Sequence, residues 1–305
     1  MNLIDPLFSR RQFLRFSIAL GGTALAALVA EGALVEPRRP FVERVEVFLA
    51  RLPKELDGLT IAQLSDFHYD SPGSAGVIRT AVEITNRLAP DVVVLTGDYV
   101  TRSPLRSRFR SAEDSKPCAQ VLGALHAPMG VFGVLGNHDY ASDPGLVTRS
   151  LEAHGITMLR NFNLRIERSG ARLWIAGVDD VLGGGARLDQ ALQGIPRDEA
   201  TVLLAHEPDY ADTVISSAVD LQLSGHSHGG QVRLPLVGAP FLPYLARKYP
   251  WGLRQLDRLQ LYTNRGIGTI LLPVRFNCPP EVTLLTLREA HRNAASTASQ
   301  SPVVS

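Results

Sequence analysis

With 305 residues, the chain is long enough for one large domain or two small ones. Hydrophobic residues make up 45% of it and charged residues 20%, which is ordinary for a globular protein with a sizeable core. The net charge of +1 creates no overall field that would attract nucleic acid, so we expect no nucleic-acid partner. Cys118 and Cys278 stand far apart and form no pair typical of a metal site, and the sequence leaves open whether they form a disulfide.

The first thirty residues have the composition of a targeting segment. Arg10 and Arg11 precede a Phe–Leu step, a basic residue and an uncharged run at 16–30. This order resembles the bacterial twin-arginine export signal, which implies the export machinery as a partner and a periplasmic or outer-face location. The uncharged run is shorter than the ~20 residues of a comfortable membrane span. Residues 1–33 are therefore interpreted as a signal or a membrane anchor, with cleavage left open and an arginine-rich surface helix as the alternative.

Apolar runs alternate with segments of helical periodicity along the rest of the chain. Residues 31–40 contain proline and arginine and are predicted to form a linker. Strands are predicted at 45–49, 59–64, 91–95, 131–135, 156–159, 164–167, 173–178, 201–205, 221–224 and 282–287, and helices at about 77–88, 116–126 and 144–153. Strands that are apolar on both faces and mixed with helices predict an α/β fold with covered sheets. We place this domain at 34–290 and a disordered tail at 291–305.

Metal-binding side chains follow five of the predicted strands. They are Asp66, His68, Asp98, Asn137, His138, His206, His226 and His228. Five of the eight histidines in the chain stand at these strand ends, where α/β folds form their sites. Carboxylates with several imidazoles and no thiolate favour Mn²⁺, Fe, Zn²⁺ or Ni²⁺ over Mg²⁺ or Ca²⁺. Seven ligands, leaving His138 aside, are too many for one ion, so the sequence predicts two ions with Asp98 shared between them.

The same residues carry a family resemblance. The blocks Asp66-x-His68, Gly97-Asp98, Gly136-Asn137-His138-Asp139, His206 and Gly225-His226-Ser227-His228 resemble those of the calcineurin-like metallophosphoesterase superfamily. Segments 225–231, 262–269 and 273–276 are similar to its YkuE/YaeI-like bacterial branch. The resemblance covers about 59–287 and implies two mixed β-sheets sandwiched between helical layers. It also implies one ion held by Asp66, His68, Asp98 and His228, and a second held by Asp98, Asn137, His206 and His226.

The resemblance further implies a reaction. A hydroxide that bridges the two ions would attack a phosphate ester, and His138 would stand beside the leaving oxygen as its catalytic partner. One position departs from the protein phosphatases of the superfamily, because Thr101 stands where an Asp would orient the catalytic histidine. This departure weakens the protein-phosphatase interpretation and a strongly acidic role for His138. The neighbouring Arg102 could contact the substrate phosphate or be an ordinary solvated loop arginine.

These inferences lead to a phosphohydrolase, and we expect a phosphodiesterase that acts on envelope or lipid-linked phosphate esters. Two features favour the cell envelope, namely the export signal and the apolar, proline-rich segment Leu234–Trp251. That segment could hold acyl chains or touch a membrane surface, or it could pack into the core. The alternatives for function are a broad phosphomonoesterase and a non-catalytic, metal-stabilised scaffold, which has no need of an open metal position.

Overall fold

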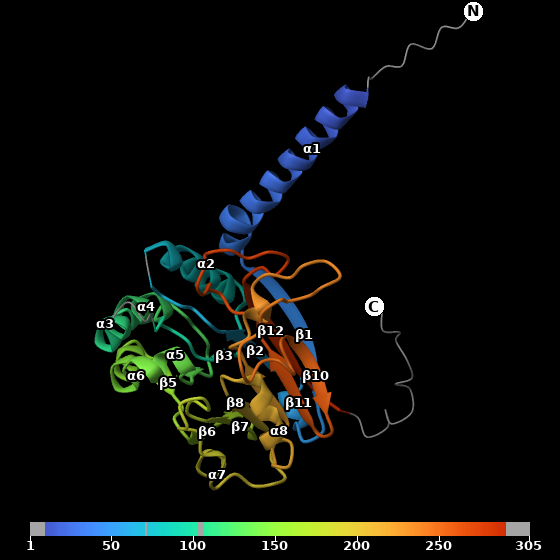
Figure 1. Ribbon diagram of the computed structural model, residues 1–305. Coiled ribbons are helices and arrows are strands. Elements are labelled where there is room, and N and C mark those ends of the chain that lie inside the picture. The colour runs from blue at the N-terminus through green and yellow to red at the C-terminus, as the bar shows by residue number, and fades with distance from the viewer. Residues whose placement is uncertain (1–9, 71, 103–106, 291–305) are drawn as a thin grey trace, which may run out of the picture.

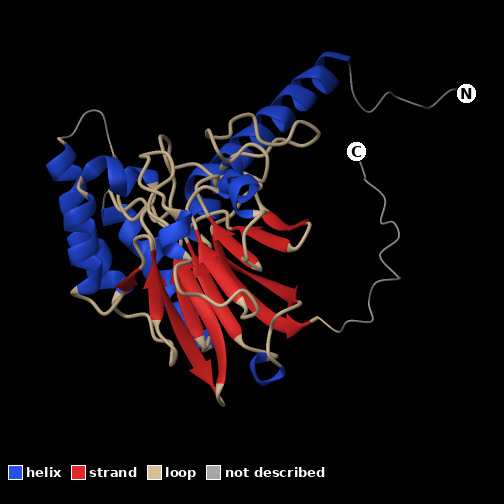
Figure 2. Cartoon of the chain, turned by 90° about the horizontal axis from the view of Figure 1, so that it is seen from below, coloured by secondary structure: helices blue, strands red, loops and turns tan. Residues whose placement is uncertain are grey.

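The structure, a computed structural model, describes residues 10–70, 72–102 and 107–290, so the predicted tail at 291–305 lies outside the described residues. Two six-stranded sheets form the centre of the domain, and helices lie outside them (Figures 1 and 2). This arrangement confirms the predicted α/β fold with two mixed sheets between helical layers. Cys118 and Cys278 are both buried as free thiols, which answers the open question of a disulfide.

Each sheet combines parallel and antiparallel pairs. The first has the order β1 (Phe41–Leu49), β12 (Glu281–Glu289), β2 (Thr60–Leu64), β3 (Val92–Leu95), β4 (Val131–Gly133) and β5 (Thr157–Met158). The second has the order β10 (Gly252–Leu256), β11 (Leu259–Thr263), β9 (Leu221–Ser224), β8 (Thr201–Leu204), β7 (Ala171–Gly177) and β6 (Phe162–Arg168). β2 to β5 are parallel to one another, as are β7, β8, β9 and β11. The sequence analysis did not predict β10 and β11.

Successive side chains of β3 pack into different layers of the domain. Val92 and Val94 point into the core between the two sheets, whereas Val93 and Leu95 point toward the helices on the outer face. All four side chains are fully buried, as the nearly continuous apolar run predicts for a central parallel strand. A third cluster covers the outer face of the second sheet. The strands that carry the predicted site are therefore packed on both faces, which fixes the positions of their ends.

The helices on the first sheet begin and end where local signals place them. They are α2 (Pro72–Leu88), α3 (Arg108–Glu113), α4 (Ser115–Leu122), α5 (Asn137–Ser142) and α6 (Pro144–Glu152), and the shorter α7 (Leu188–Ala191) and α8 (Ala211–Val214) belong to the second half. The side chain of Asp143 caps α6 by accepting a hydrogen bond from the Leu146 N–H at 2.9 Å. α4 ends at Leu122, earlier than predicted, because Gly123 closes its last turn.

The N-terminal helix α1 (Arg10–Ala30) projects away from the domain, and its side chains at 11–23 and 26–30 are exposed (Figure 1). The helical segment Arg11–Arg38 is long and apolar enough to cross a membrane, a property that signal sequences share. The prediction of a linker at 31–40 is wrong. A π-helical turn at Glu31–Val35 and a 3₁₀ turn at Glu36–Arg38 follow α1 directly, and the Arg275 N–H donates to the Gly32 carbonyl at 2.8 Å. The domain thus holds the end of the helix.

The sequence left open whether the segment Leu234–Trp251 is exposed for contact with lipid or packs into the core. The structure shows that its two parts differ in this respect. Its first part is exposed, including Leu236 and Phe241. Its second part packs on the second sheet, where Tyr249 joins the outer cluster and donates to the Asp212 carboxylate at 2.9 Å. The first part therefore remains available for contact with another molecule.

Candidate metal centre

The loops that carry the predicted site residues meet at one edge of the two sheets. Asp66 and His68 follow β2, Asp98 follows β3, Asn137 and His138 begin α5 after β4, His206 follows β8, and His226 and His228 follow β9. Because β2, β3 and β4 are parallel, and β8 and β9 are parallel, each set of strands ends on the same side of its sheet. The face-to-face packing of the sheets then brings the two sets of ends together.

Several of these residues have a backbone conformation that is unusual for residues other than glycine. The φ angle is +53° at Asp66, +45° at His68, +57° at Asp98, +66° at His226 and +51° at His228. Each such residue stores roughly 1 kcal/mol or more of strain, which persists where the surroundings hold it. Backbone hydrogen bonds between the loops hold it here, from Asp66 N–H to Gly97 and from His68 N–H to Asp98, at 2.9 and 3.0 Å. These five residues direct their side chains to the point where the loops converge.

Gly97 is required at its position between β3 and Asp98. Its φ angle is +96°, and a Cβ there would stand 2.5 Å from the Gly136 nitrogen and 2.9 Å from Nδ1 of His206. No side chain fits in that space. The glycine therefore allows the loops after β3, β4 and β8 to come close enough to share one site.

Two groups of side chains have the spacing of metal ligands. In the first, Asp66, His68 and His228 offer atoms that all lie within 4.8 Å of one another, and the two Nε2 atoms are 3.0 Å apart. In the second, Asp98, His206 and His226 meet the same limit. Oδ2 of Asp98 lies 3.5 Å from Nε2 of His68 and 3.3 Å from Nε2 of His206. Asp98 thus stands between the two groups, where a shared ligand is expected.

Hydrogen bonds to the far side of the rings leave one nitrogen of each free for a metal. Nδ1 of His206 bonds the Thr96 carbonyl at 2.6 Å, and Nε2 of His226 bonds the Tyr244 carbonyl at 2.9 Å. Such partners commonly fix the orientation of metal-binding histidines. Among the buried polar atoms of the described residues that make no hydrogen bond are Oδ1 of Asn137 and Nε2 of His206, which has Oδ2 of Asp98 beside it at 3.3 Å. Buried polar atoms without partners are rare, and a bound ion would satisfy both. The donor set therefore fits two metal ions.

Burial controls the protonation of three of the histidines. It lowers the pKa of His68 to about 3 and that of His226 to about 4, and it holds the pKa of His228 well below its usual range. These imidazoles are neutral at physiological pH, which is the form that binds a metal. Burial, assisted by the nearby negative charge of Asp98, raises the pKa of Asp66 to about 6.

His206 and Asp98 form a charged pair at the centre of the site. Burial opposes charge on both side chains, but the attraction between them outweighs it. The pKa of His206 is raised well above its usual range by Asp98 and Asp66, and the pKa of Asp98 is held well below its usual range by His206 and His138. A positive charge is therefore favoured beside Asp98, and a metal ion would replace the proton of His206 there.

His138 has a different setting from the other histidines. Its Nδ1 accepts a hydrogen bond from the Arg102 backbone N–H at 2.8 Å, so the proton of the neutral ring is on Nε2. Its ring stands edge-on to the ring of His68 at 4.9 Å, and it also lies close enough to His68 and Asp98 to form a third possible metal group. A protonated Nε2 is a hydrogen-bond donor and a poor ligand, which favours contact with substrate. Thr101 does not serve His138, since its hydroxyl lies 3.3 Å from Nδ1 of His68.

Asp139 holds the backbone of two site loops in place, a role that was not predicted from the sequence. Its buried carboxylate accepts backbone N–H groups of Asp98, Tyr99, Val100 and Gly136 at 2.8 to 3.1 Å. These bonds fix the loop after β3 against the start of α5. A signal was present in the sequence, because Gly136 and Asp139 have the spacing of a helix capping box.

The fully buried Arg275 was also missed as a support of the site. Its guanidinium donates to the carbonyls of Arg265, Gly266, Gly268 and Cys278. The loop that it holds, residues 264–268, in turn binds the loop of the first metal group. Its Ile267 N–H donates to Ser65 and its Gly268 N–H to Asp66, at 2.9 and 2.7 Å. The segment 273–276 was noticed only for its family resemblance, and nothing in the hydrophobic periodicity distinguishes Arg275 from a surface arginine.

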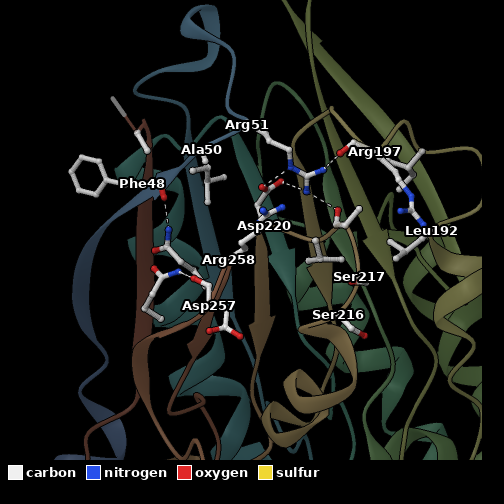
Figure 3. A pocket seen from close by; sticks show the side chains of 17 residues that line it. Phe48, Ala50, Arg51, Leu192, Arg197, Ser216, Ser217, Asp220, Asp257 and Arg258 are labelled. Atoms are coloured by element: carbon white, nitrogen blue, oxygen red, sulfur yellow. Dashed lines mark hydrogen bonds and ion pairs between the residues drawn. The ribbon is translucent and has the colours of Figure 1, made fainter. Parts of the chain in front are cut away.

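Two cavities in the described part of the chain bear on the location of the site. One, of about 340 Å³, extends from His68 past Ile267 to Leu271, Leu272 and the turn that follows α1. The other, of about 810 Å³, contains none of the predicted site residues (Figure 3). There Arg51 is held by the Asp220 carboxylate through two hydrogen bonds of 2.8 Å. Of these two, the smaller cavity reaches a predicted metal ligand.

Comparison with known proteins agrees with this geometry. Residues 59–230 match the calcineurin-like phosphoesterase family. Over 290 residues the chain is 32% identical to the metallophosphoesterase YkuE of Bacillus subtilis (strain 168), covering 93% of this chain and 99% of the relative. It is 31% identical over 285 residues to the phosphodiesterase YaeI of Escherichia coli (strain K12), covering 92% and 100%. It is also 31% identical over 313 residues to a transmembrane protein with metallophosphoesterase domain of Danio rerio, covering 95% and 69%. The chain belongs to the calcineurin-like phosphoesterase family.

Proposed function

We propose that this enzyme is a phosphodiesterase that acts on lipid-linked phosphate esters of the cell envelope. Membership of the family makes it a phosphoric ester hydrolase that uses two divalent transition-metal ions. The observation that carries the finer proposal is the cavity of about 340 Å³, which joins His68 to the exposed Leu271 and Leu272. An ester with its phosphate at the metal centre could extend an apolar group along this cavity. The name of the Escherichia coli relative supports a diester as the substrate.

The two metal groups suggest how the ligands divide. We assign one ion to Asp66, His68, Asp98 and His228, and the other to Asp98, Asn137, His206 and His226. The contacts around Asp98 support this division, because its Oδ2 lies within 3.5 Å of a histidine from each set. Two such ions supply a nucleophile at neutral pH and positive charge for the phosphoryl oxygens.

The remaining roles belong to residues outside the two metal groups. His138 would donate from Nε2 to the leaving oxygen, since its Nδ1 is occupied by the Arg102 N–H. This hydrogen bond keeps the donating nitrogen directed away from the loop of residues 101–102. Arg102 would contribute to substrate binding from the same loop. Thr101 would steady His68, with which its hydroxyl is in contact.

The proposed location follows from the N-terminus. Residues 1–33 would direct export by the twin-arginine pathway and, if retained, would anchor residues 34–290 on the outer face of the membrane. The exposed helix α1 supports an anchor, because its length and composition suit a bilayer. The name of the Danio rerio relative is consistent with this arrangement.

A metal and substrate experiment tests the proposal. Purified full-length protein is stripped with a chelator and reloaded with Mn²⁺ or Mg²⁺, and hydrolysis of nitrophenyl phosphate, its diester and a lipid-linked diester is measured. We expect two bound ions, recovery with Mn²⁺ beyond that with Mg²⁺, and faster hydrolysis of diesters. Asp98→Asn should lose metal and activity together, whereas His126→Asn, at an exposed histidine away from the centre, should lose neither.

Two results would contradict it. Faster hydrolysis of the monoester would support the broad phosphomonoesterase instead. Full metal loading with no hydrolysis of any ester would support the non-catalytic scaffold.

A further inference from the structure

We propose that the end of the domain where α1 enters is a surface that docks onto a lipid bilayer and opens the metal-centre cavity toward it. We call this the docking surface and define it by six exposed apolar residues, Leu234, Leu236, Val237, Phe241, Leu271 and Leu272. Docking itself does not depend on the proposed function. Only its purpose, to admit a lipid-linked substrate, rests on that proposal.

The exposure of these side chains is unusual for a protein in water. Leu236 is 103% exposed, Leu271 89% and Val237 69%. No charged residue stands between 234 and 246 or between 266 and 274, so each tip is apolar without interruption. Apolar side chains gathered at two loop tips mark a surface that another apolar phase covers. Transfer of each leucine out of water favours binding to such a phase.

The two loops of the docking surface are joined into one unit. Gln231 donates from Nε2 to the carbonyls of Ile270 and Leu272 at 3.1 and 3.0 Å, and its Oε1 accepts the Ile270 N–H at 2.8 Å. Backbone bonds add to this link, from Phe276 N–H to Gln231 and from Arg233 N–H to Phe276, at 3.0 and 2.8 Å. A rigid pair of tips can present its leucines to a surface without an entropic penalty for ordering them first.

The same unit holds the end of α1, which argues for a bilayer as the occupant. The Arg275 N–H donates to Gly32, and the Asn277 N–H donates to the Glu36 carboxylate at 3.0 Å. α1 leaves the domain at the end where the loops 234–241 and 269–273 lie (Figures 1 and 2). If α1 enters a membrane, this end of the domain must meet the headgroups. Arg38 and Arg39 are exposed at the end of the turn that follows α1, where their positive charges could contact anionic headgroups.

The docking surface also communicates with the metal centre. The cavity of about 340 Å³ is lined by Ala33 and Leu272 at one end and by His68 at the other. The segment that carries Leu236 returns to the site as well, because the Tyr244 carbonyl bonds Nε2 of His226. A lipid with its head at the metals could therefore keep its apolar part in or near the bilayer. A soluble protein partner would not need this continuity with the cavity.

Site-specific fluorescence on the full chain tests the proposal. A cysteine introduced as Leu236→Cys or Leu271→Cys is labelled with a polarity-sensitive dye, while the buried Cys118 and Cys278 stay unlabelled. The matched control is Phe162→Cys, which is 60% exposed on β6, on the other side of the domain from α1 (Figure 1). In vesicles of phosphatidylcholine and phosphatidylglycerol, we expect a blue shift at 236 and 271 and loss of emission when spin-labelled lipid is added. The control label should show neither change.

A kinetic comparison adds an independent measurement. Leu236→Glu and Val237→Glu, at two residues that do not line the cavity, should each slow hydrolysis of a lipid-linked diester in vesicles by about tenfold or more, because each removes an apolar side chain from the bilayer. Hydrolysis of a soluble nitrophenyl diester should stay unchanged, as it should for Phe162→Glu on both substrates.

The outcomes separate docking from the proposed function. If the labels at 236 and 271 behave like the label at 162, docking is wrong, whatever the enzyme hydrolyses. If those labels enter the bilayer but no ester is hydrolysed, docking stands and the proposed function fails. Equal losses on the vesicle and soluble diesters would show that the glutamates damage the fold, and the fluorescence result then decides.

Discussion

At the scale of single residues, the partner of His138 determines what this side chain can do. A carboxylate at Nδ1 would stabilise a positively charged ring, but here Nδ1 accepts the backbone N–H of Arg102. The tautomer of the ring that fits this hydrogen bond carries its proton on Nε2. We expect His138 to stabilise the leaving oxygen by a hydrogen bond from Nε2 and to have no share in metal binding.

This gives a prediction for His138→Asn. The variant should keep two ions and the fold, because His138 donates only its backbone N–H to Asp98, at 2.9 Å. Turnover of an alkyl ester should fall by roughly 10²–10³-fold, the usual contribution of one hydrogen-bond donor to a developing oxyanion. The loss should be smaller for a nitrophenyl ester, whose leaving oxygen is already stable as an anion. Metal content and both rates are measured beside His126→Asn, and a lost metal or an equal loss on both esters would contradict the assignment.

The identities of the site residues could be predicted, whereas their conformations could not. The chemistry of Asp66, His68 and Asp98 is visible because each follows an apolar run in the sequence. Their positive φ angles depend on bonds from Gly97 and the neighbouring loops, which only the folded chain provides. The role of Asp139 was missed for the same reason, because three of its four N–H partners lie about forty residues earlier.

At the scale of elements, the loop of residues 264–268 connects the N-terminal region with the first metal group. Arg275 holds this loop through its side chain and holds Gly32 through its backbone. The segment 262–269 was noticed in the sequence only for its family resemblance, and β11, which precedes the loop, was not predicted. Its burial arises from neighbours at β9 and β10, so periodicity alone could not reveal it.

The prediction at this scale concerns Arg275→Met. Four buried carbonyls would lose their donor, and each unsatisfied group costs about 1–3 kcal/mol, so we expect a loss of at least about 3 kcal/mol in unfolding free energy. Metal affinity should also fall, because the loop no longer holds Asp66. Arg275→Lys should lose less, since it keeps the charge and some donors. Urea unfolding and metal analysis check this, with the exposed Arg254→Met as the control; equal stability of both Met variants would contradict it.

At the scale of the whole molecule, the metal centre exists only in the folded chain. Its proposed ligands span from Asp66 to His228 and come from both sheets, so an unfolded chain could not hold the ions in this arrangement. The number of sheets and the covering helices could be predicted from the apolar strands and the family resemblance. The attachment of α1 could not, because residues 31–40 have the composition of a linker and gain their structure from contacts with Arg275 and Asn277.

Because the metal centre forms only on folding, the route by which the enzyme is exported decides whether it can bind its ions before export. The twin-arginine pathway carries folded proteins, so the enzyme could acquire its ions before it crosses the membrane. Changing Arg10→Lys and Arg11→Lys together should leave folded, metal-loaded and active enzyme inside the cell, because the charge is kept but the arginine pair is lost. Arg15→Lys, in the same segment, is the control and should still be exported. Fractionation and protease treatment of spheroplasts locate the protein. If the double variant is still exposed on the outer face, the enzyme uses another route, and loading of the centre before export loses its support.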